Sequence, residues 1–327
     1  MRGLIRALVL IGILTLSSSC EKADNKGRGG GDQQKLTIAV IPKGTTQQFW
    51  KSVEAGARQA EGEFDVKVLW QGPIKEDDRA QQIAITEQFV TDKVGAIALA
   101  PLDDAALVKP VQEASAKKIP VVIFDSALRG VAGKDFASFV ATDNHLGGKL
   151  GGEQLVKLLD GKGKVVLLRY AEGSASTSER EAGFLEVMKG HAPGIEVISD
   201  NRYAGVTAAE AQTASMNMLD TLKQANGIFC PNESSTVGMI LTLRQAGLNG
   251  KVKLVGFDTS PALIDYLRKG DVDALVAQNP TKMGYEAVKT AAAVARGQKV
   301  EPRIDTGVRV ITRPDLDDPE VKKLLGI

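Results

Sequence analysis

The chain has 327 residues, of which 43% are hydrophobic and 25% are charged, and its formal net charge is +1. This composition is typical of a soluble globular protein with two domains of ordinary size, and the small net charge gives no indication of a nucleic acid partner. Two histidines and two cysteines are too few for us to expect a His/Cys metal site or a disulfide framework.

Residues 1–20 have the features of a bacterial export signal. Two arginines precede an apolar stretch over residues 7–16, and three serines then lead to Cys20. This stretch is too short to span a bilayer. We predict lipidation of Cys20. Ordinary cleavage is the alternative, because lipoprotein signals usually carry leucine where Ser17 stands. The Gly-rich residues 21–35 predict a flexible tether. The later sequence contains no apolar run of 18 or more residues, so we expect no membrane span there.

The first half of the remaining chain alternates apolar strands with helical periodicity. We predict strands at 36–42, 65–70, 96–100 and 121–124, and helices at 49–63, 77–92 and 104–117. This alternation indicates a parallel sheet with helices on both faces.

The alternation starts again near residue 143. We predict helices at 146–159, 176–190, 208–223, 236–246, 261–269 and 282–296, and strands at 164–168, 195–199, 227–230, 254–256, 274–278 and 308–311. The acidic tail, residues 315–327, is expected to form a surface cap.

One βαβ unit occurs twice, about 130 residues apart. Residues 121–127 (VVIFDSA) and 254–260 (LVGFDTS) are both apolar runs that end in Phe-Asp and a hydroxyl residue. The repeat predicts an α/β fold with two similar lobes, and it places Asp125 and Asp258 at the carboxyl ends of parallel strands. Ligands of open α/β sheets bind at that edge, so two facing edges would form a binding cleft.

The helix at 282–296 follows the completed second lobe and is expected to return to the first. The predicted lobes are therefore 36–142 plus 279–306 and 143–278 plus 307–327. Three crossings, near 126–143, 278–280 and 305–308, would form a hinge that lets the lobes close.

An aromatic pair and two acids are candidates for sugar binding. Phe49 and Trp50 stand at a strand–helix junction in a chain with 5% aromatic residues. An aromatic ring can pack on the apolar face of a sugar, although helical spacing predicts one core ring and one cleft ring. Asp125 and Asp258 could each accept hydroxyl hydrogen bonds, with helix N-capping as the alternative.

Three further polar residues are candidates. Arg180 offers five donors to sugar oxygens, or it could form a surface salt bridge with a neighbouring glutamate. Asn232 ends a strand and could bind ligand or cap a loop. Gln278 lies at a predicted crossing, where it could reach ligand or only position the hinge.

Other motifs give weaker indications of function. The glycines at 147, 148, 151 and 152 lack the spacing of a phosphate loop and predict close helix packing. Cys230 is expected to be a buried apolar residue. No nucleophile–base pair is visible, so we expect no catalysis, and we expect no cofactor.

Taken together, these residues resemble the periplasmic sugar-binding proteins of the ribose-binding type, which serve ABC transporters. The resemblance runs from about residue 36 to 311. It implies a type I periplasmic binding protein fold, in which two Rossmann-like lobes close on one sugar. It also implies that the aromatic pair stacks on the sugar and that the ligand-contacting positions include Asp125, Arg180, Asn232, Asp258 and Gln278.

Two departures leave the sugar open. Ser126 stands where ribose binders have arginine, and Gln47 where they have asparagine. Residues 41–43 instead look like the branch that binds rhamnose or a furanosyl quorum signal, where a lysine at the position of Lys43 contacts ligand. A pentose, hexose, deoxysugar or polyol remains compatible with the sequence.

The resemblance implies an exported, monomeric solute-binding protein in the periplasm or cell envelope, anchored through Cys20, that delivers its sugar to an ABC transporter permease. Two alternatives stay open. The protein could present a sugar to a chemoreceptor or sensor kinase, or it could bind the quorum signal. A repressor would need an N-terminal DNA-reading motif, and the export signal and tether occupy that place.

Overall fold

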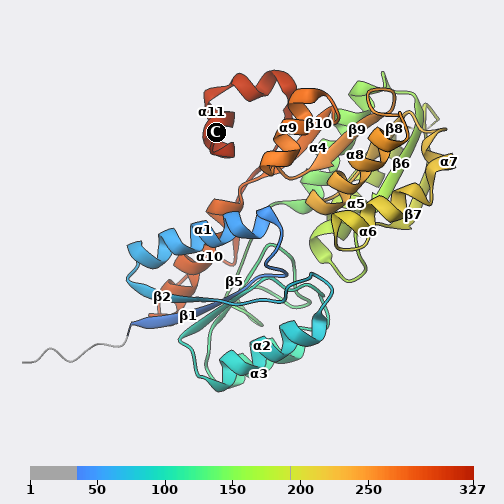
Figure 1. Cartoon of the computed structure of the whole chain (residues 1–327). Helices are drawn as coiled ribbons and strands as arrows, with labels where there is room; N and C mark the ends of the chain where they lie inside the picture. Colours follow the sequence, from blue (N-terminus) through green and yellow to red (C-terminus); the bar gives the residue numbers. More distant parts are fainter. Residues whose placement is uncertain (1–34, 192) are drawn as a thin grey trace, which may run out of the picture. The chain divides into compact units, whose positions relative to one another are not determined.

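A computed structural model describes residues 35–191 and 193–327 (Figure 1). The predicted export signal, Cys20 and almost all of the predicted tether lie outside the described residues. Within those residues, no helix combines the length and apolar character needed to cross a membrane.

The first sheet is six-stranded, with the order β11-β5-β4-β3-β1-β2. Its strands pair in parallel throughout. They are β1 (Leu36–Ile41), β2 (Val66–Trp70), β3 (Ala96–Leu99), β4 (Val121–Phe124), β5 (Ser138–Ala141) and β11 (Arg303–Asp305). We call this sheet and its helices the first lobe.

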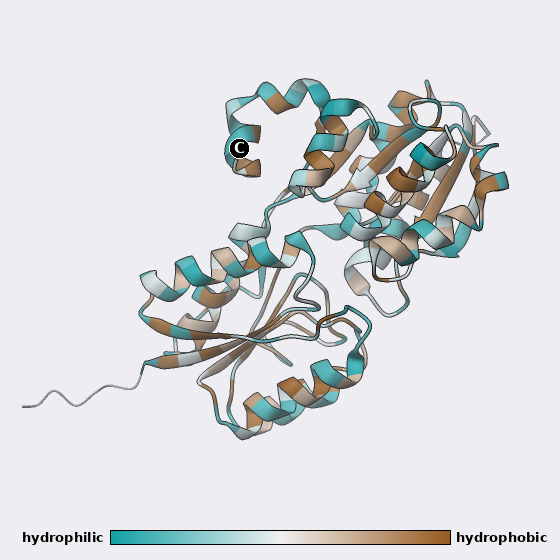
Figure 2. Ribbon diagram, in the orientation of Figure 1, coloured by the Kyte–Doolittle hydropathy of each residue, from teal (hydrophilic) through white to brown (hydrophobic). Residues whose placement is uncertain are grey.

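Two pairs of helices cover the first sheet (Figure 1). Residues of α1 (Gln48–Glu63) and α10 (Pro280–Ala295) share one core cluster with the sheet. Residues of α2 (Arg79–Thr91) and α3 (Val108–Ala116) share another. Because both faces are covered, the central strands are continuously apolar, and they appear brown in Figure 2.

The second sheet repeats this plan, with the order β12-β10-β9-β8-β6-β7. Its strands are β6 (Gly163–Arg169), β7 (Ile195–Tyr203), β8 (Gly227–Phe229), β9 (Lys253–Phe257), β10 (Ala274–Gln278) and β12 (Val308–Thr312). Only the edge strand β12 pairs antiparallel, with β10. This sheet and its helices form the second lobe.

Helices cover both faces of the second sheet as well. α4 (Asn144–Leu158) and α5 (Ala175–Gly190) contribute to one core cluster. The opposite cluster takes side chains from α6 (Ala208–Met216), α7 (Leu219–Leu222), α8 (Glu233–Gln245) and α9 (Pro261–Lys269). The chain passes between the sheets three times, between β5 and β6, between β10 and β11, and between β11 and β12.

The α/β fold with two parallel sheets is as predicted, but several local predictions were wrong. The helix predicted from residue 104 begins at Val108, because the Asp103 carboxylate accepts hydrogen bonds from the backbone N–H groups of Ala105 and Ala106 and holds a turn. The helix predicted at 208–223 is two helices, α6 and α7. Strands β5 and β11 were not predicted.

The C-terminal tail has more structure than the predicted surface cap. A 3-10 helix, η1 (Arg313–Asp317), leads into α11 (Pro319–Leu325). Asp318 caps α11 by accepting from the N–H groups of Glu320 and Val321, and Pro319 occupies the first turn, where a missing N–H costs nothing. Val321 is fully buried in the second lobe's core.

Candidate ligand-binding site

The carboxyl ends of strands from both sheets border one cavity of about 20 Å³. This is room for about one or two water molecules. It is lined by Lys43, Gln47, Phe49, Trp50, Glu76, Asp125, Tyr170, Ser176, Thr177, Arg180, Asn232, Asp258 and Gln278. Every candidate ligand residue from the sequence except Ser126 is in this lining, although their contact with ligand stays a prediction.

Ser126 lies beside the cavity and links the two lobes. Its side chain is fully buried, and its Oγ accepts a hydrogen bond of 3.0 Å from the backbone N–H of Ser176. The structure therefore gives this residue a contact between lobes.

The prediction of one core ring and one cleft ring was wrong. Phe49 and Trp50 are 9% and 2% exposed, they pack edge to face with ring centroids 4.9 Å apart, and both line the cavity. The first turn of α1 lies where the core and the cavity are continuous, so both rings belong to the core cluster and border the cavity.

Asp125 forms a buried ion pair in the first lobe. Its φ of 61° is in the left-handed region, which a non-glycine residue adopts at a cost. The carboxylate lies 3.2 Å from Lys43 Nζ. Lys43 also donates to the hydroxyls of Ser174 (3.2 Å) and Ser176 (2.9 Å) in the second lobe, so the ammonium group contacts both lobes.

Asp258 has the same backbone geometry in the second lobe, with a φ of 74°. Its carboxylate accepts from the backbone N–H of Glu233 (2.8 Å) and from Gln278 Nε2 (2.7 Å). Burial raises its pKa, and the nearby Arg180 guanidinium opposes that rise. Asp258 does not cap α9, which follows its own strand, because Ser260 holds that position.

Gln278 makes the hinge-positioning contact that was the alternative to ligand binding. While its amide N–H donates to Asp258, its Oε1 accepts from the hydroxyl of Thr142 at another crossing (2.9 Å). The residue thus orients the Asp258 carboxylate and ties two crossings together.

Arg180 is buried, contrary to the surface salt-bridge alternative. It donates to Asn144 Oδ1 and to the carbonyl of Pro231, both at 2.9 Å, and its guanidinium lies 3.9 Å above the Phe257 ring. Burial lowers its pKa, while Asp258 and Asp125 oppose the shift. Stacking and two hydrogen bonds fix the guanidinium plane against the cavity.

The predicted helix-packing role of the glycine run is confirmed, and it positions Arg180. A Cβ on Gly148 of α4 would lie 1.9 Å from the Arg180 carbonyl oxygen on α5. A Cβ on Gly183 would lie 2.1 Å from the carbonyl oxygen of His145. The two helices can approach this closely only where side chains are absent.

Asn232 caps α8, which was the alternative to ligand binding. Its Oδ1 accepts from the backbone N–H and the hydroxyl of Ser235. Its amide group donates to Ser234 Oγ. Cys230, also at the end of β8, is a buried free thiol as predicted.

Several polar residues of the site escaped the sequence analysis, Ser176 and Thr177 of the cavity lining among them. Glu76 and Tyr170 line the cavity, and the Tyr170 hydroxyl donates to Glu76 across the lobes at 3.1 Å. Glu233 accepts a hydrogen bond of 3.1 Å from the backbone N–H of Phe49, also across the lobes. Glu76 stands in a loop among exposed charges, and Glu233 precedes the helix predicted at 236–246, so neither position indicates a contact across the lobes.

The Glu233 contact predicts a pH dependence of stability. Burial, and then the Asp258 charge, raise the pKa of Glu233 from 4.5 to about 7. The folded protein therefore holds this proton more tightly than the unfolded chain, so its contribution to the free energy of unfolding is present below pH 4.5 and is lost as pH rises to about 7. Glu233→Gln, which resembles the protonated acid, should lose less stability than wild type between pH 5 and pH 8.

Denaturant unfolding at both pH values checks this. Glu179→Gln, at an exposed site of the same lobe, is the matched control and should follow wild type. Equal pH dependence in wild type and Glu233→Gln would show that Glu233 does not titrate in this range.

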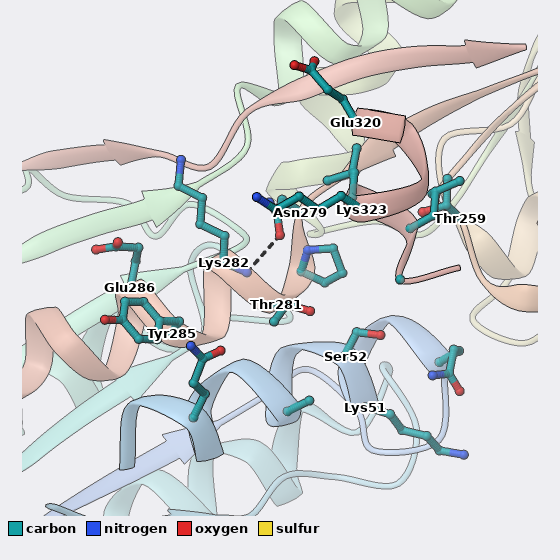
Figure 3. A pocket seen from close by; sticks show the side chains of 17 residues that line it. Lys51, Ser52, Thr259, Asn279, Thr281, Lys282, Tyr285, Glu286, Glu320 and Lys323 are labelled. Carbon is teal, nitrogen blue, oxygen red and sulfur yellow. Dashed lines mark hydrogen bonds between the residues drawn. The ribbon is translucent and has the colours of Figure 1, made fainter. Parts of the chain in front are cut away.

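A wider cavity of about 1010 Å³ lies outside this site. It is lined from α1, α10 and α11, with Lys51 and Ser52 on α1 and Lys282 and Tyr285 on α10 (Figure 3). Of the candidate ligand residues from the sequence, none lines it. It joins helices of the first lobe to the tail of the second.

Comparison with known proteins identifies the family. The sequence model of the family described as "periplasmic binding protein domain" matches residues 38–299. The D-ribose/D-allose-binding protein of Pseudomonas aeruginosa is 29% identical over 86% of this chain and 90% of its own. The ribose import binding protein of Haemophilus influenzae is 27% identical over 94% of this chain and 98% of its own.

Solved structures agree. A carbohydrate transporter solute-binding protein from Agrobacterium radiobacter in complex with D-arabinose has a TM-score of 0.85 and 34% identity, over 90% of this chain and 99% of that one. A solute-binding protein from Agrobacterium vitis with bound D-fucose has a TM-score of 0.84 and 35% identity, over 88% and 99%. The chain therefore belongs to the family of periplasmic binding proteins of the ribose-binding type, whose members bind ligands rather than transform them.

Proposed function

We propose that this protein captures a neutral monosaccharide or polyol between its two lobes and delivers it to an ABC transporter. The observation that carries the proposal is the convergence of polar side chains from both lobes on one cavity beside an aromatic pair. Asp125 and Lys43 come from the first lobe, and Arg180 and Asp258 from the second.

The chemistry of these groups suits a polyhydroxyl ligand. Carboxylates accept hydrogen bonds from hydroxyls, and a guanidinium donates to hydroxyl and ring oxygens. Phe49 and Trp50 supply apolar surface for the C–H face of a ring. D-Arabinose and D-fucose in the related structures, both neutral monosaccharides, support this ligand class.

Capture requires the lobes to open and close. A cavity of about 20 Å³ cannot admit a sugar. The contacts that close it include Lys43 to Ser176 and Glu233 to Phe49, which join one lobe to the other. A ligand that bonds to both lobes favours the closed form, because only that form makes both sets of contacts.

Delivery to a permease is supported by the wider cavity. Its lining combines α1 and α10 of the first lobe with Thr259 and α11 of the second. Closure would change its shape, so a membrane partner that docks there could distinguish the closed form from the open form. We place the protein in the periplasm as a monomer, held at the membrane through a lipid on Cys20.

Neutral sugars should bind and anionic sugars should not. The cavity lining holds three carboxylates, those of Glu76, Asp125 and Asp258, and two cations, of which Lys43 already pairs with Asp125. We expect a neutral pentose, hexose, deoxysugar or polyol to raise the melting temperature by several degrees, because ligand at about 100 times Kd adds about 2.7 kcal/mol.

A thermal-shift screen that includes hexuronates and sugar phosphates checks this. The acids should give no shift at the concentration that saturates binding of the neutral sugar. A shift with the acids alone would contradict the proposed ligand class.

A further inference from the structure

Glu76 stands at the wall of the cavity with both carboxylate oxygens held by donors. Its Oε1 accepts from Trp50 Nε1 at 2.8 Å, and its Oε2 accepts from the Tyr170 hydroxyl at 3.1 Å. These two contacts come from different lobes. They fix the carboxylate plane next to the ring that borders the ligand site.

The Glu76 carboxylate, which lines the cavity, retains accepting capacity. Each carboxylate oxygen can accept about two hydrogen bonds, and each Glu76 oxygen uses one in these contacts. Among the described residues, Glu76 forms no salt bridge, since the nearby ammonium of Lys43 is paired with Asp125. Burial raises the pKa of Glu76, and Lys43 opposes the rise.

A partly buried acceptor with spare lone pairs is best satisfied by a donor. Burying a charged group without full hydrogen bonding costs free energy, and a hydroxyl placed against the carboxylate recovers part of it. A ligand with a C–H group at the same place would leave the cost in full. The residue can therefore discriminate between sugars that differ at one carbon.

We propose that Glu76 is a specificity-determining ligand contact, which accepts a hydrogen bond from one hydroxyl of the sugar beside Trp50 and selects against sugars deoxygenated or methylated at that carbon. This inference rests on the proposed function, since it assigns a further contact in the same site. Trp50 and Tyr170 act as positioning residues for the carboxylate.

The test pairs protein variants with ligand analogues. The neutral sugar found in the screen and its monodeoxy analogues are titrated calorimetrically into wild type, Glu76→Gln and Glu179→Gln. Glutamine at position 76 keeps an oxygen for Trp50 but turns the other end into an amide donor. Glu179→Gln is the matched control, because it makes the same chemical change at an exposed site that does not line the cavity.

Wild type should lose about tenfold or more in affinity for one deoxy analogue, as expected for a hydrogen bond to a charged group. Glu76→Gln should bind the parent sugar about tenfold or more weakly and should no longer discriminate against that analogue. Glu179→Gln should keep both the affinity and the discrimination of wild type. If Glu76 had a purely structural role, Glu76→Gln would instead weaken the binding of the parent sugar and of every analogue by the same factor.

Retained discrimination in Glu76→Gln would overturn the assignment of Glu76 and leave the proposed function intact. Absence of sugar binding by wild type would overturn the proposed function and this inference with it. If Glu76→Gln does not fold, Glu76→Asp replaces it. The shortened side chain withdraws the carboxylate by one methylene, and it should reduce both parent affinity and discrimination, with unchanged values overturning the proposal.

Discussion

Replacement of Arg180 by alanine is expected to weaken sugar binding by about 2–4 kcal/mol, or roughly 30- to 1000-fold in Kd. The guanidinium is buried on the Phe257 ring, and the charge of Asp258 acts on it. Its removal deletes donors to the sugar and leaves a buried carboxylate without its main opposing charge, which adds an unpaired-group cost to the lost contact. Titration calorimetry with the sugar from the screen measures the effect.

Arg244→Ala is the matched control for this experiment. Arg244 belongs to the same lobe and pairs with Asp271, but it does not line the cavity. This variant should lose some stability and keep its affinity. Affinity of Arg180→Ala within about threefold of wild type would mean that the sugar does not use this cavity.

Replacement of Gly148 by alanine is expected to lower the free energy of unfolding by about 1–3 kcal/mol and to weaken binding as well. The new Cβ would lie 1.9 Å from the backbone oxygen of Arg180. The obstacle is a backbone atom, so α4 and α5 must separate. Arg180 moves with α5, which couples the packing defect to the ligand site.

Gly190→Ala isolates the packing effect. Gly190 is the last residue of α5, the helix that carries Arg180, and a Cβ there meets no atom within 4 Å. This change should leave stability unchanged or increase it slightly, because alanine restricts the unfolded chain. Denaturant unfolding of both variants measures the difference, and equal stabilities would contradict the packing assigned to Gly148.

Much of the fold could be predicted because each copy of the βαβ repeat lies within one continuous stretch of sequence. The two Phe-Asp strand ends marked Asp125 and Asp258, and the structure places both beside one cavity with matching left-handed backbone geometry. Strand β11 escaped prediction because three residues, Arg303–Asp305, show no clear periodicity. Its place at the sheet edge is set by pairing with β5, which lies far away in sequence.

The site was harder to predict where a side chain acts across the lobes. Glu76 lies between Lys75 and Asp77 in a charged loop, and nothing local distinguishes a carboxylate that turns inward to Trp50 from one that faces solvent. Glu233 precedes the helix predicted at 236–246, and nothing local indicates that its partner is the N-terminus of α1. Such contacts depend on how two sheets meet, which local periodicity does not encode.

The central claim is that a neutral sugar binds between the lobes, and titration calorimetry of the protein with D-ribose, D-allose, D-arabinose and D-fucose tests it most directly. The account predicts that at least one of these sugars, or a close neutral analogue, binds with one-to-one stoichiometry and a Kd in the micromolar range or tighter. If no neutral sugar or polyol at millimolar concentration gives heat of binding, the result would contradict the central claim.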